Sequence, residues 1–490
     1  MSFRKSLAVN FFASSGATLV QFVVSLIVAR ILTPAEIGVF SIAVVIVAIA
    51  HVFREFGVGS YLQRAQSIGK DEVRSALAVA YVLAFGMAAI IFASSGFVAR
   101  WFGYPDIAPV MRVLALGFLL IPFGSVPLAL LLREYDATKI AVATAAGTSA
   151  YSITCIGLAL AGWGAVSLAW ANLANILASG LAFLWARPLH MSYHPRFREL
   201  GGIIRFGSGA LFANLVKAGN DAVPDIVLGK IGTARQVGLV SRANSTVHIF
   251  TYVAGSAMTF GSQTYLAKAF HAGESLEPIM HRAIALVTGV GWPLLAVTAI
   301  VANEVIVTLY GSQWSAAAPA VLPLALMAAI ELTFHYHVSA FNAVDRPALA
   351  AIPLTVTAAM RAVLALALFS GDLVSFAWAL MLATLATAPV WFALQHRHLR
   401  MRATGFLAML LPSAVLAALC AGAAWLALEA VRSIGVGSPL LTLIAIAAPI
   451  GLAWLAGLWL LSHPLWVEIG LVARTFRLKL LPRARGKGMS

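Results

Sequence analysis

Residues 29–43 of the chain read ARILTPAEIGVFSIA, and residues 229–243 read GKIGTARQVGLVSRA. At this offset of 200 positions, five of the fifteen residues are identical. The identical pairs are Ile31/Ile231, Thr33/Thr233, Gly38/Gly238, Ser41/Ser241 and Ala43/Ala243. Each copy stands between two long apolar segments, so the match indicates an internal repeat. The offset is compatible with six membrane spans per repeat, and an even number makes the repeats parallel, related by an axis along the membrane normal.

Apolar segments of this kind recur over the whole sequence. Hydrophobic residues make up 61% of the 490 residues and charged residues only 10%, whereas a soluble protein carries roughly 25% charged residues. At ~20 residues per span, the apolar runs predict an all-α polytopic membrane protein with about 14 transmembrane helices and no large domain outside the membrane. The expected spans are 7–32, 37–56, 75–99, 107–132, 138–161, 164–186, 202–227, 237–260, 283–306, 316–341, 348–371, 374–394, 405–430 and 439–462.

The repeat and the spans together predict the domain organisation. We expect an N-terminal six-helix lobe over residues 1–190, a C-terminal six-helix lobe over 200–398, and two additional transmembrane helices over 405–462. In such parallel repeats the substrate site is a central cavity between the halves. Residues 463–490 form a basic tail in which apolar residues recur at helical spacing, and this pattern predicts an amphipathic helix on the anionic inner leaflet. Those apolar residues are Leu465, Ile469, Val472, Phe476 and Leu480.

The distribution of positive charge predicts the orientation. The chain holds 33 Lys and Arg against 18 Asp and Glu. In a soluble protein such a balance would suggest nucleic acid, but here 24 of the 33 fall on the side of the N-terminus and six on the other side. The remaining three, Lys217, Arg242 and Arg361, lie within spans. By the positive-inside rule both termini are cytoplasmic, and no nucleic-acid partner is expected.

The span 202–227 is the most polar. Asn214, Lys217, Asp221 and Asp225 are spaced by 3, 4 and 4 residues, which places them on one face of a helix. Ionisable groups in the hydrocarbon zone cost about 2.5–3.5 kcal/mol each, so we expect them to face the interior. The functional interpretation is a cavity wall that offers a cation to phosphate and a carboxylate to a coupling cation or to sugar hydroxyls. The structural alternative is a buried Lys217–Asp221 ion pair with Asp225 solvated near the outer end.

Three further features of the spans carry hypotheses. Pro224 is expected to break the helix beside these carboxylates. Arg242 and Arg361 would suit a diphosphate, because a guanidinium bonds two oxygens at once. The alternative for Arg242 is an end-of-helix side chain that extends to the outer interface. That alternative is harder to satisfy for Arg361, which lies near the middle of its span.

Two pairs of polar residues complete the candidates. Glu331 and His335 stand one helical turn apart and form either a proton relay or a hydrogen-bonded pair between packed helices. Asn172 and Asn175 either bond sugar hydroxyls or hold helices together. Coupling to a proton or a sodium ion stays open, and the sequence predicts no cofactor and no metal site.

Four stretches resemble a known family: LTPAEIGVFSIA (32–43), YPDIAPVMRVLAL (104–116), LALLLREYDATKIAVAT (128–144) and LGKIGTARQVGLVSRA (228–243). They are similar to the polysaccharide transporter branch of the multidrug/oligosaccharidyl-lipid/polysaccharide exporter superfamily, over about residues 1–400. The resemblance implies two six-helix lobes plus two helices, and alternating access to a central cavity. It also implies a flippase of the bacterial inner membrane that moves an undecaprenyl-pyrophosphate-linked oligosaccharide to the outer leaflet. Polysaccharide polymerase and export machinery are the implied partners.

Other functional classes are less well supported. The sequence contains no Walker loop, HExxH, CxxC or nucleophile elbow, so an enzyme or an ATP-driven pump is not expected. Two alternatives stay open. One is a cation-coupled drug exporter of the same superfamily, which would favour an anionic cavity. The other is a non-transporting scaffold of a glycan assembly complex.

Overall fold

The computed structural model describes residues 3–54, 59, 62, 69–134, 136–186, 194–197, 200–259 and 262–471. Over these ranges every element is helical. By length and composition, 11 of the helices can cross a membrane, or up to 12 if the bent pair α5 and α6 forms one span. The predicted all-helical membrane class is therefore confirmed, but the count of 14 spans is not. Helices α9 and α10 coincide with the expected seventh and eighth spans, yet they are too polar to be counted.

The chain divides into two compact units. Unit 1 comprises Met1–Arg242, Leu309–Ala317 and Leu354–Leu380, and unit 2 comprises Ala243–Thr308, Ala318–Pro353 and Met381–Ser490. The units differ in membership from the predicted six-helix lobes, 1–190 and 200–398. The arrangement of those lobes stays a prediction.

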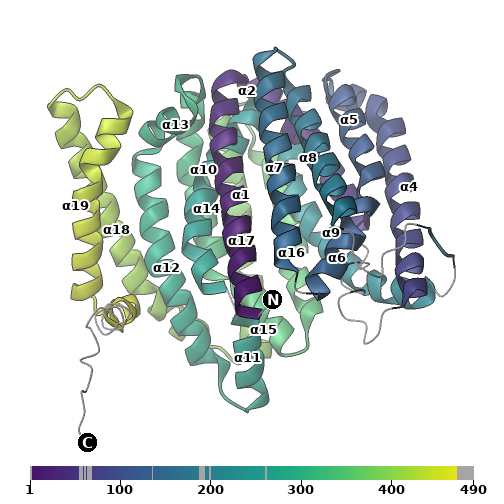
Figure 1. Cartoon of the computed structure of the whole chain (residues 1–490). Coiled ribbons are helices and arrows are strands. Elements are labelled where there is room, and N and C mark those ends of the chain that lie inside the picture. The colour runs from purple at the N-terminus through teal and green to yellow at the C-terminus, as the bar shows by residue number, and fades with distance from the viewer. Residues whose placement is uncertain are drawn as a thin grey trace, which may run out of the picture. The chain divides into compact units, whose positions relative to one another are not determined.

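Helix α2 belongs to unit 1, most of whose helices are labelled in Figure 1. This helix packs against α4, α5, α8 and α9, while α7 packs against α1 and α8. The helices of unit 1 are α1 (Phe3–Ile31), α2 (Pro34–Arg54), α4 (Lys70–Phe102), α5 (Ile107–Leu120), α6 (Pro122–Arg133), α7 (Ala137–Leu160), α8 (Ala165–Trp185), α9 (Leu200–Ile231), the first residues of α10 (Ala234–Thr259), most of the 3-10 helix η1 (Ser312–Ala320), most of α16 (Ala351–Leu368) and the start of α17 (Leu373–Leu399).

The two repeat copies begin their helices in the same way. At the start of α2, the Thr33 backbone N–H donates to the Glu36 carboxylate at 2.7 Å, and the Glu36 N–H donates to the Thr33 hydroxyl at 3.3 Å. At the start of α10, Gln236 takes the place of Glu36: the Thr233 N–H donates to its side-chain carbonyl at 2.9 Å, and the Gln236 N–H donates to the Thr233 hydroxyl at 3.2 Å. This reciprocal arrangement is a capping box, which satisfies backbone donors that a helix start leaves open. It explains why both copies keep a threonine at this position.

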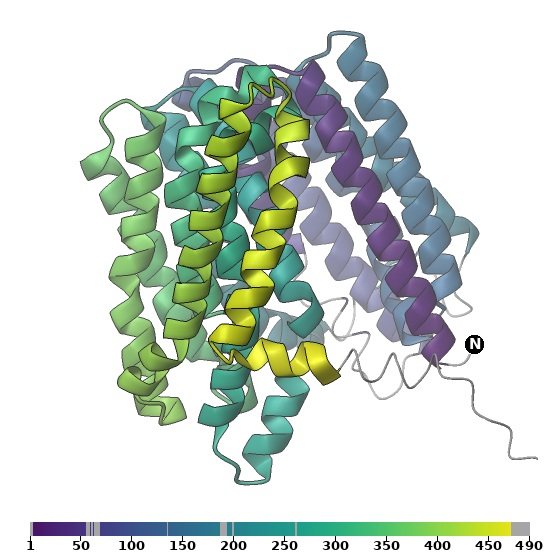
Figure 2. The same ribbon diagram turned by 90° about the vertical axis from the view of Figure 1, so that its left-hand side faces the viewer.

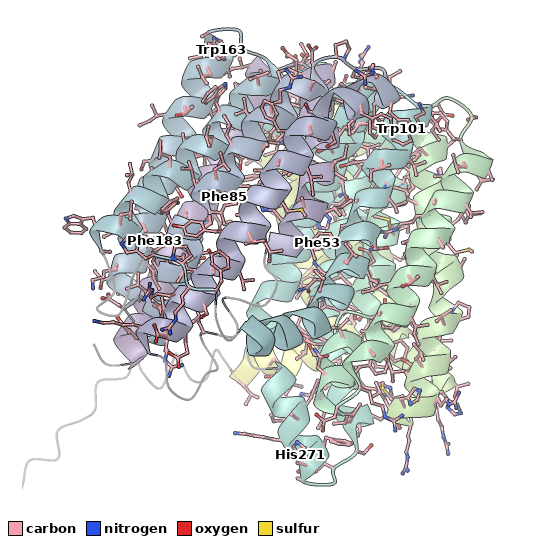
Figure 3. The ribbon with its side chains drawn as sticks, turned by 90° about the vertical axis from the view of Figure 1, so that its right-hand side faces the viewer. Phe53, Phe85, Trp101, Trp163, Phe183 and His271 are labelled. Carbon is pink, nitrogen blue, oxygen red and sulfur yellow. The ribbon has the colours of Figure 1, made fainter. Side chains whose placement is uncertain are left out.

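Exposed tryptophans mark both ends of unit 1. Trp101 and Trp163, which are 45% and 51% exposed, lie at the same end (Figure 3). Trp185 ends α8, the helix that starts just after Trp163, and is 82% exposed. Because tryptophan is enriched at both membrane–water interfaces, these positions support a membrane-spanning orientation of the unit 1 helices.

Unit 2 contains the remaining helices. Helix α12 packs against α14 and α18, and α18 packs against α19. The helices of unit 2 are the rest of α10, α11 (Ser262–His271), α12 (Leu276–Ile300), α13 (Ala302–Tyr310, of which the last two residues belong to unit 1), α14 (Val321–Thr333), α15 (His337–Ala343), the 3-10 helix η2 (Pro347–Ala350), the rest of α17, α18 (Ala403–Ser433) and α19 (Pro439–Leu460).

Three expected spans are less regular than predicted. The span 107–132 is bent by 49° between α5 and α6, where Pro122 begins the second helix. The span 283–306 ends as α12 at Ile300, and a new helix, α13, starts at Ala302. The span 316–341 is interrupted by a turn at residues 334–336. Hydropathy reports that a segment is apolar but not where its backbone bends, which is why the sequence did not place these breaks.

The beginning of the C-terminal tail is a helix, residues 464–471, that follows the end of α19 and runs crosswise to it (Figure 2). Leu465 and Ile469 of this helix pack into an apolar cluster with Leu416 and Leu458. Arg282 of α12 forms an ion pair with Glu468. The predicted tail helix is therefore present up to residue 471, and Val472, Phe476 and Leu480 lie outside the described residues.

A buried hydrogen-bond chain fixes His463 at the start of this tail. The Leu465 N–H donates to His463 Nδ1 at 3.2 Å. The neutral ring therefore carries its hydrogen on Nε2, which donates to Ser413 Oγ at 3.0 Å. The Ser413 hydroxyl lies 2.9 Å from Thr288 Oγ1, which donates to the Ile284 carbonyl at 2.9 Å. We call these residues the His463 anchor.

Candidate functional site

The two repeat copies meet where α2 and α10 cross. A Cβ atom added to Gly38 would lie 1.7 Å from the Ala234 carbonyl oxygen, and one added to Gly238 would lie 1.9 Å from the Pro34 carbonyl oxygen. The hydroxyl of Ser41 bonds that of Ser241 at 3.3 Å. The contact of Gly38 with residue 234 thus has its counterpart in the contact of Gly238 with residue 34, as across a local twofold axis. We call the four residues Gly38, Gly238, Ser41 and Ser241 the glycine crossing.

Hydrogen bonds to backbone atoms surround the glycine crossing. Trp314 Nε1 donates to the Ala29 carbonyl at 2.7 Å, and Gln313 donates to the same carbonyl at 2.7 Å. Tyr104 Oη accepts from the Ala234 N–H at 3.1 Å and donates to the Gly232 carbonyl at 3.2 Å. This end of unit 1 is therefore held together by hydrogen bonds between side chains and backbone atoms.

Arg242 follows the glycine crossing directly. Its guanidinium carbon lies 5.6 Å from the ring centroid of Tyr310 and 6.0 Å from that of Trp314. Such cation–π contacts are attractive at these distances. The structure thus places Arg242 against aromatic rings inside unit 1, and Arg242 is not among the residues that line the hollow described next.

A hollow of about 280 Å³ lies between α2 and α9 and has one polar and one apolar wall. Helix α9 contributes Asn214, Lys217 and Asp221, the residues that the sequence placed on one helical face. The apolar wall consists of Val45, Ala48 and Val52 of α2 together with Ala218 and Ala222. The side chains of Lys217 and Asp221 are 70% and 61% exposed and form an ion pair at 3.6 Å. The predicted pair therefore exists, but it is open to the hollow instead of buried.

A chain of polar contacts leads from this ion pair into the unit. Arg361 of α16, 4% exposed, donates to Asn220 Oδ1 at 3.4 Å. The amide nitrogen of Asn220 donates to Asp221 Oδ1 at 3.4 Å. Since arginine only donates and an ionised carboxylate only accepts, these two neighbours fix which way the Asn220 amide points. Arg361 thus lies behind the hollow and not on its wall.

Asp225 and Pro224 lie further along α9. Asp225 is partly buried and has no hydrogen-bond or ion-pair partner among the described residues. The expected break at Pro224 was wrong, because α9 is a single helix from Leu200 to Ile231 with Pro224 inside it. A membrane helix tolerates an internal proline where neighbouring groups satisfy the freed backbone carbonyl.

The other candidates do not join the hollow. The side chain of Asn172 donates to the Leu168 carbonyl of its own helix at 3.2 Å, and Asn175 lies against Gly147 where α7 and α8 approach closely. Glu331 and His335 belong to unit 2, where both are exposed and α14 ends between them at Thr333.

Sequence reasoning missed several residues of unit 1. Asn220 was missed because its role depends on Arg361, 141 positions away. The T-x-x-E and T-x-x-Q patterns at Thr33 and Thr233 are capping-box signals that could have been found in the sequence. Ala48 and Val45 carry no signal, since nothing distinguishes them from the lipid-facing residues of an apolar span.

Two characterised relatives match the chain over part of its length. The succinoglycan biosynthesis transport protein ExoT of Rhizobium meliloti is 27% identical over 325 residues, which are 64% of each chain. The lipopolysaccharide biosynthesis protein WzxC of Escherichia coli is 22% identical over 307 residues, or 62% of each chain. The match thus spans just under two thirds of each relative's length.

Solved structures share the fold. The lipid II flippase MurJ in an inward closed conformation superimposes with a TM-score of 0.71 at 12% identity, covering 91% of this chain and 97% of MurJ. An inward-facing multidrug transporter of the MATE family gives a TM-score of 0.60 at 17% identity, covering 78% and 94%.

A family model described as polysaccharide biosynthesis protein matches residues 27–319, which include α2, α9 and the glycine crossing. That match covers more than half of the chain and confirms the resemblance seen in the sequence. It agrees with the all-helical membrane class that the structure shows. The chain belongs to the polysaccharide biosynthesis protein family.

Proposed function

We propose that the protein is a flippase that moves an undecaprenyl-pyrophosphate-linked oligosaccharide from the cytoplasmic to the outer leaflet of a bacterial inner membrane. Family membership and the names of two relatives, a succinoglycan transport protein and a lipopolysaccharide biosynthesis protein, support this function. In the proposed orientation both termini are cytoplasmic, and the basic tail contacts anionic lipids of the inner leaflet.

The hollow between α2 and α9 is the observation that carries the proposal. Lys217 lies 17 residues from the start of α9 and 14 residues from its end, which is roughly 20–25 Å from either end at 1.5 Å per residue. A polar wall at this depth offers a polar headgroup hydrogen bonds where the bilayer offers none. A flippase needs such a place halfway across the membrane.

A second hollow supports a lipid-linked cargo. It lies in unit 2, has a volume of about 580 Å³, and is lined by almost wholly apolar side chains of α12, α14, α17 and α18. A lining of this kind presents almost no polar group to a hydrocarbon chain, so it is compatible with a lipid tail. We propose that a hydrocarbon chain can occupy this hollow.

Alternating access is the mechanism we propose, with two six-helix lobes that rock about a central cavity. In this mechanism the close contact of α2 and α10 at the glycine crossing must open during transport. Coupling to a proton or sodium ion is a separate proposal. Asp225, with no partner among the described residues, is its first candidate, followed by Asp221, Glu331 and His335.

Reconstitution tests the function. Purified protein in liposomes should move a lipid-linked oligosaccharide to the opposite leaflet, measured by its accessibility to an added glycosidase. In cells, Lys217→Ala and Arg361→Ala should abolish polymer export while the protein stays in the membrane, and Lys268→Ala, at an exposed lysine of α11, serves as control. Efflux of ethidium without movement of the glycan lipid would favour the drug exporter. Normal polymer output from both variants would refute a transport role for this polar wall.

A further inference from the structure

We propose that the hollow between α2 and α9 binds one sugar residue of the cargo through Asp221 and Lys217, and does not bind the diphosphate. The inference rests on the proposed function and makes it more specific. It also gives Asp221 a different role from ion coupling: the carboxylate is a specificity-determining group for the glycan.

Hydrogen-bonding chemistry separates the two ligands. A diphosphate offers only acceptors at neutral pH, and so does the carboxylate of Asp221, which lies in the hollow beside Lys217. The charges of Lys217 and Asp221 also cancel, so these two groups give the polar wall no net positive charge. A diphosphate would therefore meet repulsion from Asp221 and only one compensating cation.

A sugar residue satisfies both members of the ion pair. Each hydroxyl group donates one hydrogen bond and accepts others. Neighbouring hydroxyls on one ring can thus donate to the Asp221 carboxylate and accept from the Lys217 ammonium. Asn214, which also lines the hollow, offers both a donor and an acceptor. The wall presents the mixture of partners that a polyhydroxylated ring requires.

The shape and the opposite wall agree with a sugar ring. Val45, Ala48 and Val52 face the polar residues, so the hollow has an apolar side for the C–H groups of a ring and a polar side for its hydroxyls. Its volume of about 280 Å³ is at the lower limit of the ~300–1,000 Å³ of pockets that hold drug-sized ligands. The hollow therefore has room for a small group, not for a whole oligosaccharide.

Arg361 and Asn220 act as positioning residues for this site. Arg361 holds the carbonyl end of the Asn220 amide, which turns the amide nitrogen toward Asp221 Oδ1. The nearby Lys217 ammonium approaches the other carboxylate oxygen, Oδ2. Asp221 is thus oriented from two sides while 61% of its side chain stays exposed, and it lines the hollow. The buried Arg361 guanidinium bonds Asn220 behind the wall. The charged groups of the wall itself are therefore Lys217 and Asp221, whose charges cancel.

Binding measurements on the purified full chain in detergent test the assignment. The probes are farnesyl diphosphate and farnesyl diphosphates that carry glucose, galactose or N-acetylglucosamine, and native mass spectrometry reports their affinities. Asp221→Asn should weaken binding of at least one sugar-bearing probe tenfold or more and leave farnesyl diphosphate as tight as before or tighter. Ala48→Leu, which fills the hollow without a change of charge, should have the same selective effect.

Two controls make the same substitutions elsewhere: Asp106→Asn, at an exposed loop residue, and Ala89→Leu, on an exposed part of α4. Both should bind all probes like the wild type. The sugar assignment is overturned if Asp221→Asn changes the affinities of sugar-bearing and sugar-free probes equally, or changes neither while the wild type binds them. Failure of the wild type to bind any probe would instead contradict the proposed function itself, and with it the inference.

Discussion

Gly38 and Gly238 allow two helix backbones to touch at the glycine crossing. Their Cβ positions lie 1.7 and 1.9 Å from carbonyl oxygens of Ala234 and Pro34, which belong to the first turns of α10 and α2. Backbone atoms at a capped helix start cannot rotate away as a side chain could. We expect Gly238→Ala to destabilise the protein by about 3 kcal/mol, the upper part of the usual range for overpacking. Thermal unfolding of the detergent-purified protein measures this loss.

Gly86 provides the matched control for that substitution. It lies on an exposed part of α4, and an added Cβ atom would have no heavy atom within 4 Å. Gly86→Ala should leave the unfolding temperature unchanged or raise it, since alanine is favoured over glycine in a helix by about 1 kcal/mol. A Gly238→Ala variant that unfolds at the wild-type temperature would mean that the helices do not cross this closely.

Residue-level prediction worked where the information is local. The spacing of Lys217 and Asp221 predicted their ion pair, because residues four apart on a helix are neighbours. The identical residues of the repeat were found without their roles: Thr33 and Thr233 cap helices, and Ser41 bonds Ser241. The contact of Arg361 with Asn220 joins residues 141 positions apart and depends on packing, which no local pattern reports.

At the level of elements, hydropathy predicted the positions of the helices better than their bends and breaks. The apolar runs predicted α7, α18 and α19 to within a few residues. The short helix α11 was not expected, and neither was the bend of 49° between α5 and α6. Helices α9 and α10 were expected as the least apolar spans, and they are long helices that are too polar to be counted by composition. The position of a polar helix depends on its packing against other helices, and composition does not predict that packing.

The His463 anchor gives a prediction about the tail helix. His463→Ala removes the hydrogen bond to Ser413 and leaves a buried hydroxyl with one partner fewer, which costs about 1–3 kcal/mol. Amide hydrogen exchange of residues 464–471 should therefore become roughly 5- to 150-fold faster. His248→Ala, which removes an exposed histidine of α10, should leave the tail unchanged.

The same anchor should respond to acid. Burial lowers the pKa of His463 below its usual value of 6.5, so the folded state favours the neutral ring. Protonation would also put a hydrogen on Nδ1, where the Leu465 N–H already donates. The stabilisation is thus complete above about pH 6.5 and decreases as the pH falls toward the lowered pKa. Exchange of the tail amides is compared at pH 7 and pH 5.5 after correction for the pH dependence of unprotected amides. An equal loss of protection at pH 5.5 in the wild type and in His463→Ala would contradict this assignment.

For the whole molecule, the glycine crossing offers a test of alternating access. The hydroxyls of Ser41 and Ser241 lie 3.3 Å apart, so cysteines at these positions need only a small adjustment to form an S–S bond of ~2.05 Å. In a background with Cys155→Ala and Cys420→Ala, the oxidised Ser41→Cys/Ser241→Cys variant should stop translocating the glycan lipid, and a reductant should restore it. Each single cysteine variant should translocate with or without oxidant. Full activity in the cross-linked protein would show that this crossing does not open during transport.

Membrane potential should influence the direction of transport. In the proposed reaction a diphosphate headgroup of charge −2 moves outward from a negative cytoplasm. Its movement gains about 4.6 kcal/mol per 100 mV at ~2.3 kcal/mol per charge, if the full charge crosses the full field. Proteoliposomes in which the protein's cytoplasmic side faces a negative lumen should therefore export the glycan lipid faster than liposomes without a potential. Reversing the potential with a potassium gradient and valinomycin should slow export.

A rate that does not depend on the sign of the potential would mean that a coupling ion carries a compensating positive charge outward. Asp225→Asn should then be the variant that restores the voltage dependence.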